Sequence, residues 1–371
     1  MPLRPSTGSS LPFPGRELVL CVGPGGVGKT TSAAALGLYA ASQGRKVAVV
    51  TIDPSRRLAQ ALGLDARGRT GELVPVRREG GHLDALVLDG AKVFDTIVRT
   101  CASNPASADK ILASRIYRAT AQRLSGALEF AAMARVQMLH DAGEHDLIVL
   151  DTPPTANAID FLDAPKQVRE LIDNPGARLL AGTGRVGAKI LGLGGSVLGK
   201  TLRQIGGGDF IGDLGAFLRE FAEVLGEFHR RGGDFERLLR SPATGVLLVT
   251  TASPFSAREA REFLDQLAAY GLRIDAVLLN RTDAELPDPP ARERIERAVF
   301  AQLGESEAAR AVVDRLCTTY AGIHELGHRT RRSIDAIATS RPGLRIWTAP
   351  RHVDPPDTLA ELERLGHEIF H

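Results

Sequence analysis

Paired cysteines are absent from this 371-residue sequence. The three cysteines, Cys21, Cys101 and Cys317, are far apart and form no C-x-x-C motif. This pattern argues against a disulfide framework and against a structural zinc site, so we expect no zinc. Unpaired thiols are typical of a reducing compartment, and we expect the protein to be cytoplasmic.

The sequence also lacks a charge excess and a long apolar run. Lysine and arginine number 46, aspartate and glutamate number 44, and the net charge is +2. Such a balance provides no electrostatic basis for nucleic acid as the main partner. The best apolar stretch, residues 179–198, is interrupted by Arg185 and Lys189, which are costly at the centre of a bilayer. We therefore expect neither a nucleic-acid partner nor a membrane-spanning segment.

Short apolar runs indicate the fold class. Most of them show no alternation of polar and apolar residues, which favours central strands of a parallel sheet over a half-exposed antiparallel sheet. We predict an α/β fold with a mostly parallel twisted sheet and helices on both faces. The runs comprise residues 18–22, 47–52, 85–88, 147–150, 246–250, 276–279 and 344–347.

Two long gaps between these runs predict helical insertions. Residues 1–15 are predicted to be a disordered tail and residues 16–371 a single domain, with insertions at about 90–145 and 160–240. Within the second insertion, six residues share one apolar helical face: Leu214, Phe217, Leu218, Phe221, Leu225 and Phe228. This face either packs on neighbouring helices or forms part of a groove for an apolar client.

A complete G-x-x-x-x-G-K-[ST] motif follows the first apolar run and precedes an alanine-rich helical stretch. In such a loop the glycines turn backbone N–H groups toward phosphates, the lysine meets the β and γ oxygens, and the hydroxyl ligates Mg²⁺. The sequence therefore predicts a P-loop NTPase that binds a nucleoside triphosphate. The predicted nucleotide-binding residues are Gly25, Gly26, Val27, Gly28, Lys29, Thr30 and Thr31.

Polar residues follow three further apolar runs. Asp53 comes after the second run, where a carboxylate can orient an attacking water or hold Mg²⁺, or else serve as an N-cap before Pro54. Asp151 ends the fourth run, as expected of a Walker B acid that completes magnesium coordination. Asn280 ends the sixth run and can present an amide to a base edge.

Taken in order, these segments resemble the ArsA/guided-entry family of P-loop ATPases, which includes the arsenite-pump ATPase and the tail-anchored-protein targeting ATPase. The resemblance is carried by the phosphate loop, residues 51–54, residues 151–155 with Phe161 and Leu162, Asn280, and Pro350. Residues 56–63 and 161–166 are most similar to a bacterial subgroup often described as anion-transporting ATPase.

The resemblance implies a nucleotide-sandwich dimer that opens and closes with ATP. Lys29 and Asp53 would be catalytic, with Asp53 orienting the water; Thr30 and Asp151 would hold Mg²⁺; Asn280 and Pro350 would contact the adenine. The expected ligands are ATP, ADP and Mg²⁺. The expected partners are a second copy or a paralogous ATPase, together with a hydrophobic protein client or a membrane protein.

One departure from the family pattern bears on activity. Pro24 stands where the family has a signature lysine that reaches the partner's nucleotide. A cation supplied in trans accelerates related NTPases by about 10³ to 10⁵, so a homodimer is expected to turn over slowly unless Arg56, Arg57 or a lysine-bearing partner substitutes.

The sequence therefore predicts a cytoplasmic, Mg²⁺-dependent ATPase that couples its cycle to a dimer change and to a partner. Two alternatives remain open: the ATP-driven subunit of an anion or metalloid exporter, and a nucleotide-gated scaffold with little hydrolysis.

Overall fold

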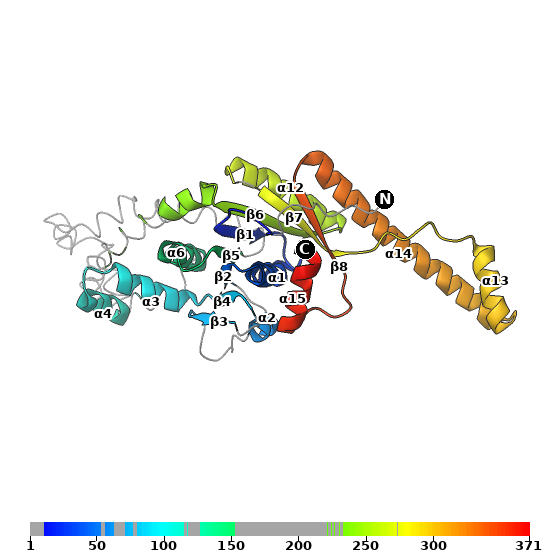
Figure 1. Ribbon diagram of the computed structural model, residues 1–371, viewed down its shortest axis with the longest axis horizontal. Coiled ribbons are helices and arrows are strands. Elements are labelled where there is room, and N and C mark those ends of the chain that lie inside the picture. Colours follow the sequence, from blue (N-terminus) through cyan, green and yellow to red (C-terminus); the bar gives the residue numbers. More distant parts are fainter. Residues whose placement is uncertain are drawn as a thin grey trace, which may run out of the picture.

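An eight-stranded sheet forms the centre of the computed structural model (Figure 1). The strands are β1 (Leu18–Val22), β2 (Lys46–Thr51), β3 (Leu73–Pro75), β4 (His82–Val87), β5 (Leu147–Asp151), β6 (Thr244–Thr251), β7 (Ile274–Thr282) and β8 (Arg345–Pro350). The structure describes residues 11–52, 56–62, 71–76, 80–114, 117, 127–152, 221, 224, 226, 230, 233–272 and 274–371.

The order of strands in the sheet is β3-β4-β2-β5-β1-β6-β7-β8. Every neighbouring pair is parallel except β3 and β4, which are antiparallel. Each predicted apolar run overlaps one of the parallel strands, and the predicted fold class is confirmed. The sequence analysis missed β3, which has only 3 residues and lies at the edge of the sheet.

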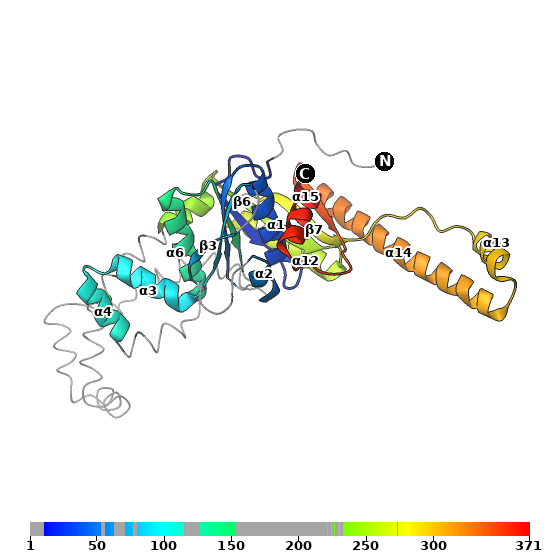
Figure 2. The ribbon, with the colours of Figure 1, turned by 60° about the horizontal axis from the view of Figure 1, so that its bottom comes forward.

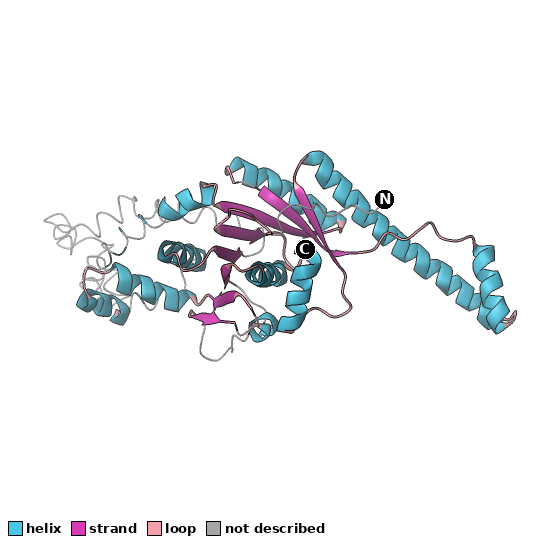
Figure 3. Cartoon of the chain, in the orientation of Figure 1, coloured by secondary structure: helices cyan, strands magenta, loops and turns pink. Residues whose placement is uncertain are grey.

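Helices cover both faces of the sheet (Figure 3). The helices are α1 (Lys29–Ser42), α2 (Arg56–Ala61), α3 (Gly90–Cys101), α4 (Pro105–Ala113), α6 (Ala127–Ala142), α12 (Pro254–Ala269), α13 (Arg292–Leu303), α14 (Glu307–Ser340) and α15 (Leu359–Phe370). Buried residues of α1, α2 and α15 pack on one face, whereas those of α3, α4, α6 and α12 pack on the other. Two apolar layers therefore enclose the sheet, as strands without alternation require.

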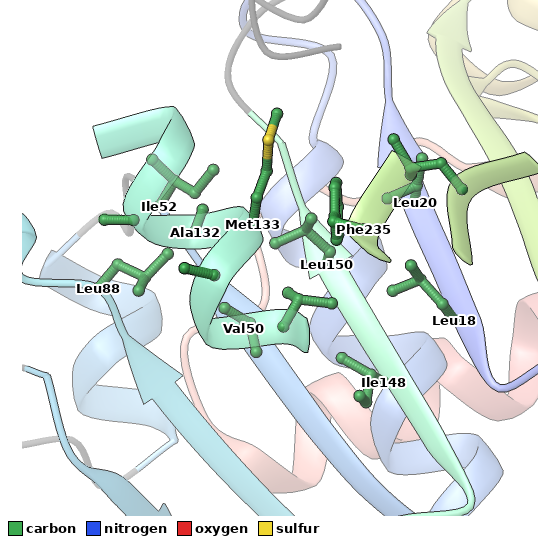
Figure 4. Packing of buried hydrophobic residues seen from close by; sticks show 14 of the residues in the cluster. Leu18, Leu20, Val50, Ile52, Leu88, Ala132, Met133, Ile148, Leu150 and Phe235 are labelled. Carbon is green, nitrogen blue, oxygen red and sulfur yellow. The ribbon is translucent and has the colours of Figure 1, made fainter. Parts of the chain in front are cut away.

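Neighbouring residues of each strand contribute to opposite layers. Leu18, Leu20 and Leu150 are fully buried in the layer that includes Met133 of α6 and Phe235, a residue that precedes β6 (Figure 4). The alternate positions on the same strands belong to the layer under α1 and α15. Both layers fix the register of the strands, and because all strands except β3 are parallel, their carboxyl ends meet at one edge of the sheet.

A pair of helices extends away from the sheet (Figures 1 and 2). We call α13 and α14 together the arm. Near the end of α14, Ile337 is buried in the core and Ile334 packs against it. Farther from the sheet α14 packs against α13. The sequence analysis did not predict the arm, which lies between β7 and β8 and is exposed along most of its length.

The two predicted insertions are described to different extents. The first contains α3, α4 and α6, of which α6 packs against β5. Most of the second lies outside the described residues; of its predicted apolar face only Phe221 is described, half-buried against the core. Across the described residues, no helix combines the length and the apolar character needed to span a bilayer.

A close approach of two helices provides a test of this packing. A Cβ atom at Gly366 of α15 would lie 2.5 Å from the Ala35 carbonyl oxygen of α1, whereas one at Gly322 of α14 would meet nothing within 4 Å. We expect Gly366→Ala to lower the free energy of unfolding by about 1–3 kcal/mol through overpacking. The control Gly322→Ala should raise it by up to about 1 kcal/mol, because alanine favours helix more than glycine does.

Urea unfolding followed by circular dichroism measures both changes. Equal shifts in the two variants would show that α1 and α15 do not pack as closely as described.

Candidate functional site

The predicted phosphate loop connects β1 to α1 at the carboxyl edge of the sheet. The strand β1 lies between β5 and β6. The strands β2, β3 and β4 lie beyond β5, whereas β7 and β8 lie beyond β6, so the strand order reverses at β1. Open parallel sheets bind ligands at the carboxyl ends of strands, at the point where the strand order reverses. The loop therefore occupies the position at which this topology forms a binding site.

Two glycines give the loop its path. Gly23 directly follows β1, and a Cβ atom there would overlap the carbonyl group of Val249 on β6. Gly28 is the N-cap of α1, with a left-handed φ of 95°. Because glycine has no side chain to cap the helix, the first N–H groups of α1 are available to an anion.

Lys29 reaches across the loop. Its Nζ donates a hydrogen bond to the Pro24 carbonyl oxygen at 2.8 Å, and the side chain is buried. Burial lowers the pKa of the ammonium from its ordinary value, while the charges of Asp151 and Cys21 act in the opposite direction. A partly desolvated cation held over a loop of backbone N–H groups is suited to binding phosphate oxygens.

Asp151 is buried at the end of β5, beside the end of β2. In the parallel register it stands opposite both Cys21 of β1 and Thr51 of β2. The Thr51 hydroxyl donates to Asp151 Oδ2 at 2.8 Å, which fixes the carboxylate. The next residue, Thr152, donates from its hydroxyl to the Cys21 carbonyl oxygen at 2.9 Å. The three strand ends are thus joined directly below the loop.

The oxygen donors at this edge fit a magnesium ion. Thr30 is half-buried in the first turn of α1, and Asp151 lies at the end of the neighbouring strand. A hydroxyl and a carboxylate are hard oxygen ligands, and Mg²⁺ is commonly held by one or two such groups together with phosphates and water. Thr31 follows in the same turn and is also half-buried.

Asn280 contacts the phosphate loop. Its Nδ2 donates to the Val27 carbonyl oxygen at 2.7 Å, and its Oδ1 accepts from the backbone N–H of Arg281 at 2.9 Å. Arg281 has a left-handed φ of 54°, and the pairing of β7 with β8 shifts register between Leu279 and Thr282. The Asn280 amide at this irregular end of β7 thus holds the phosphate loop through Val27. Contact of Asn280 with adenine stays a prediction.

The remaining predicted site residues either lie apart from the phosphate loop or are not among the described residues. Pro350 ends β8, is exposed, and pairs with Thr282. Asp53 lies outside the described residues, as do the side chains of Arg56 and Arg57. The chain leaves β2 toward Asp53 at the same edge as Asp151. A catalytic role for Asp53 stays a prediction.

No role for Thr51 was predicted from the sequence, and Cys21 was considered only as one of three scattered cysteines. The available signal for Thr51 was a hydroxyl residue at the end of the strand that precedes Asp53. Only the parallel pairing of β2 with β5 places it against Asp151. Cys21 lies in the core, since it is fully buried in β1.

The loop, the paired strand ends and the sheet order together define the P-loop NTPase class. A sequence profile of the family described as anion-transporting ATPase, ArsA type, matches residues 16–303. The chain belongs to this family.

Three known proteins are similar to most of this chain. The chain is 30% identical to an uncharacterized protein of Streptomyces coelicolor over 344 residues, which cover 92% of this chain and 80% of that protein. It is 22% identical to a putative arsenical pump-driving ATPase of Aquifex aeolicus over 72% of this chain and 64% of that protein. It is 23% identical to the ATPase get3 of Schizosaccharomyces japonicus, over 76% of this chain and 81% of that protein.

The burial of Cys21 predicts a difference in thiol reactivity. Burial raises the pKa of the Cys21 thiol well above its ordinary value, Asp151 raises it further, and Lys29 opposes the rise. Because the thiolate is the reactive form, we expect iodoacetamide to label half-buried Cys317 in the native protein and to spare Cys21 until the protein unfolds.

Mass spectrometry of tryptic peptides measures labelling at each site, with urea-unfolded protein as the control for intrinsic reactivity. Equal native labelling of Cys21 and Cys317 would contradict the burial of the strand beneath the loop.

Proposed function

We propose that this chain is a Mg²⁺-dependent ATPase whose cycle of nucleotide binding and hydrolysis changes its association with a second subunit. The observation that carries the proposal is the grouping of Lys29, Thr30, Asp151 and Thr51 at the phosphate loop. Membership of a family whose named relatives include ATPases supports the reaction type.

In this proposal each residue has a separate task. Lys29 and the N–H groups at the start of α1 bind the β and γ phosphates, and Thr30 and Asp151 hold the metal. Bound Mg²⁺ neutralises charge on the phosphate oxygens. Asp53 orients the attacking water. Thr51 is a positioning residue, because its hydroxyl fixes the Asp151 carboxylate.

Pro24 bears on the role of the second subunit, because it stands where the family has a lysine that reaches the partner's nucleotide. The family's signature cation is replaced by a buried proline whose carbonyl oxygen accepts the hydrogen bond of Lys29. Arg56 or Arg57 of this chain, or a lysine of a paralogous partner, would then supply the missing charge. Without such a substitute, the same site favours a second function: a scaffold that binds ATP, changes its contacts and hydrolyses little.

We also propose that the arm contacts a protein partner. Among the described residues, most of the large apolar side chains that are exposed lie on the arm: Leu303, Val312, Leu316, Ile323 and Leu326. Exposed apolar side chains gathered on one part of a protein are typical of protein contact surfaces. The family's anion-transport description favours, by contrast, an exporter subunit, which would require anion-stimulated turnover and a membrane partner.

A lysine comparison tests the phosphate-binding role. We expect Lys29→Ala to lower ATP turnover at least about 100-fold, as removal of a single charge-stabilising donor does in other enzymes. Lys46→Ala provides the matched control, because Lys46 is exposed at the opposite end of β2, and its turnover should stay at the wild-type value. Phosphate release measures both rates, and equal loss in the two variants would rule out a specific role for Lys29.

The rate of ATP hydrolysis distinguishes the proposed ATPase from the scaffold that binds ATP and hydrolyses little. If the chain is a self-sufficient ATPase, wild type should release phosphate, Asp53→Asn should still bind ATP but fail to hydrolyse it, and the oligomeric mass should differ between ADP and ATP. Light scattering after size exclusion measures the mass. Nucleotide binding with turnover no higher than that of Asp53→Asn would instead support the scaffold or a lysine-bearing partner.

A further inference from the structure

Three possible metal ligands meet midway along α14, away from the phosphate loop. His324 and His328 are one turn apart on α14, and their Nε2 atoms are 3.1 Å apart. Asp288, in the segment between β7 and α13, places its Oδ1 3.5 Å from His324 Nε2. The three ligand atoms all lie within 4.8 Å of one another.

The path of the segment after β7 explains why Asp288 reaches the histidines. The backbone N–H of Asp283 donates to the Thr330 hydroxyl at 3.2 Å, and Tyr320 donates from its hydroxyl to the Pro287 carbonyl oxygen at 3.2 Å. Between these contacts the segment passes so close to Gly327 that a Cβ atom there would overlap the Ala284 carbonyl oxygen. The segment therefore runs along α14 and is held on both sides of the histidine pair.

We propose that Asp288, His324 and His328 form a binding site for one divalent transition-metal ion of the Zn²⁺ type. Bonds of about 2.0–2.2 Å in a tetrahedron separate the ligand atoms by about 3.3–3.5 Å, and the two measured separations lie close to this spacing. Two imidazoles and one carboxylate are a zinc ligand set, whereas Mg²⁺ and Ca²⁺ select oxygen ligands. Three protein ligands leave the fourth position to water.

A hydrogen bond between the two imidazoles is the alternative use of the same atoms. The rings meet edge-on, with centroids 4.2 Å apart and an interplanar angle of 82°. In that arrangement one Nε2–H donates a hydrogen bond and the other Nε2 accepts it. Metal binding needs the lone pairs of both Nε2 atoms, so this proton moves to Nδ1 of its own ring and the hydrogen bond between the imidazoles is lost.

A second histidine cluster offers a comparison. The Oδ2 atom of Asp84 lies 2.8 Å from Nε2 of both His82 and His145. These distances are those of direct hydrogen bonds and are shorter than the spacing of ligands around a metal. The cluster is therefore the internal control.

The metal would connect the segment after β7 to the middle of α14 and thereby hold this segment against the arm. This proposal departs from the expectation of no zinc, which considered only the spacing of cysteines. The signal in the sequence is the H-x-x-x-H spacing of His324 and His328 within a helix, which places both side chains on one face.

The experiment uses the full chain without an affinity tag, stripped of metal with EDTA and dialysed. Titration with Zn²⁺ in a calorimeter should show one tight site per chain. His324→Ala and His328→Ala should each weaken that site at least about tenfold, since loss of even an outer-shell partner has this effect. The matched variants His82→Ala and His145→Ala should bind Zn²⁺ as wild type does.

Two further readouts separate coordination from a structural effect. Circular dichroism checks that each variant folds, and the visible spectrum of bound Co²⁺ distinguishes four-coordinate from six-coordinate geometry. Unfolding midpoints should rise with Zn²⁺ in wild type and not in His328→Ala. Tight Zn²⁺ binding that survives both arm variants, binding lost in the His82 or His145 variant, or no tight site in wild type would overturn the proposal.

Discussion

The hydrogen bond between Thr51 and Asp151 joins two strand ends at the point on which the site depends. Asp151 is a buried carboxylate, and a buried charge is costly unless it is hydrogen-bonded or paired. Thr51 supplies one of its hydrogen bonds, and the charge of Lys29 interacts with it from the loop above. The parallel register of β1, β5 and β2 makes this arrangement possible, and the two apolar layers of the sheet maintain the register.

The central fold could be predicted from the sequence because its signals are local. A buried parallel strand is a short apolar run, and the run at residues 246–250, for example, lies within β6. The phosphate loop is also local: motif, preceding strand and following helix are contiguous. The arm was not predicted because α14 is exposed along most of its length, and nothing local in its sequence shows that the helix extends away from the sheet.

The site was predictable only in part, since several of its contacts join distant residues. The Asn280 amide meets the Val27 carbonyl oxygen from a strand far along the chain, and only the order β1-β6-β7 brings the two together. The pairing of Thr51 with Asp151 likewise depends on which strand is inserted beside β2. Midway along α14, Asp288 approaches His324 because Gly327 leaves space for the intervening backbone. Such contacts leave no continuous pattern in the sequence.

Because α14 is long, a small rotation of this helix at its anchored end moves its far end by a large distance. The helix has 34 residues and is held to the body at its C-terminal end, where Ser333 contacts the Ala252 carbonyl oxygen just beyond β6 and Arg341 pairs with Asp265 of α12. At about 1.5 Å per residue, the part of α14 before Ser333 is a rod of about 39 Å, so a tilt of about 10° at Ser333 would displace the far end by about 7 Å. The arm would thus act as a lever whose fulcrum lies beside the edge of the sheet that carries the phosphate loop.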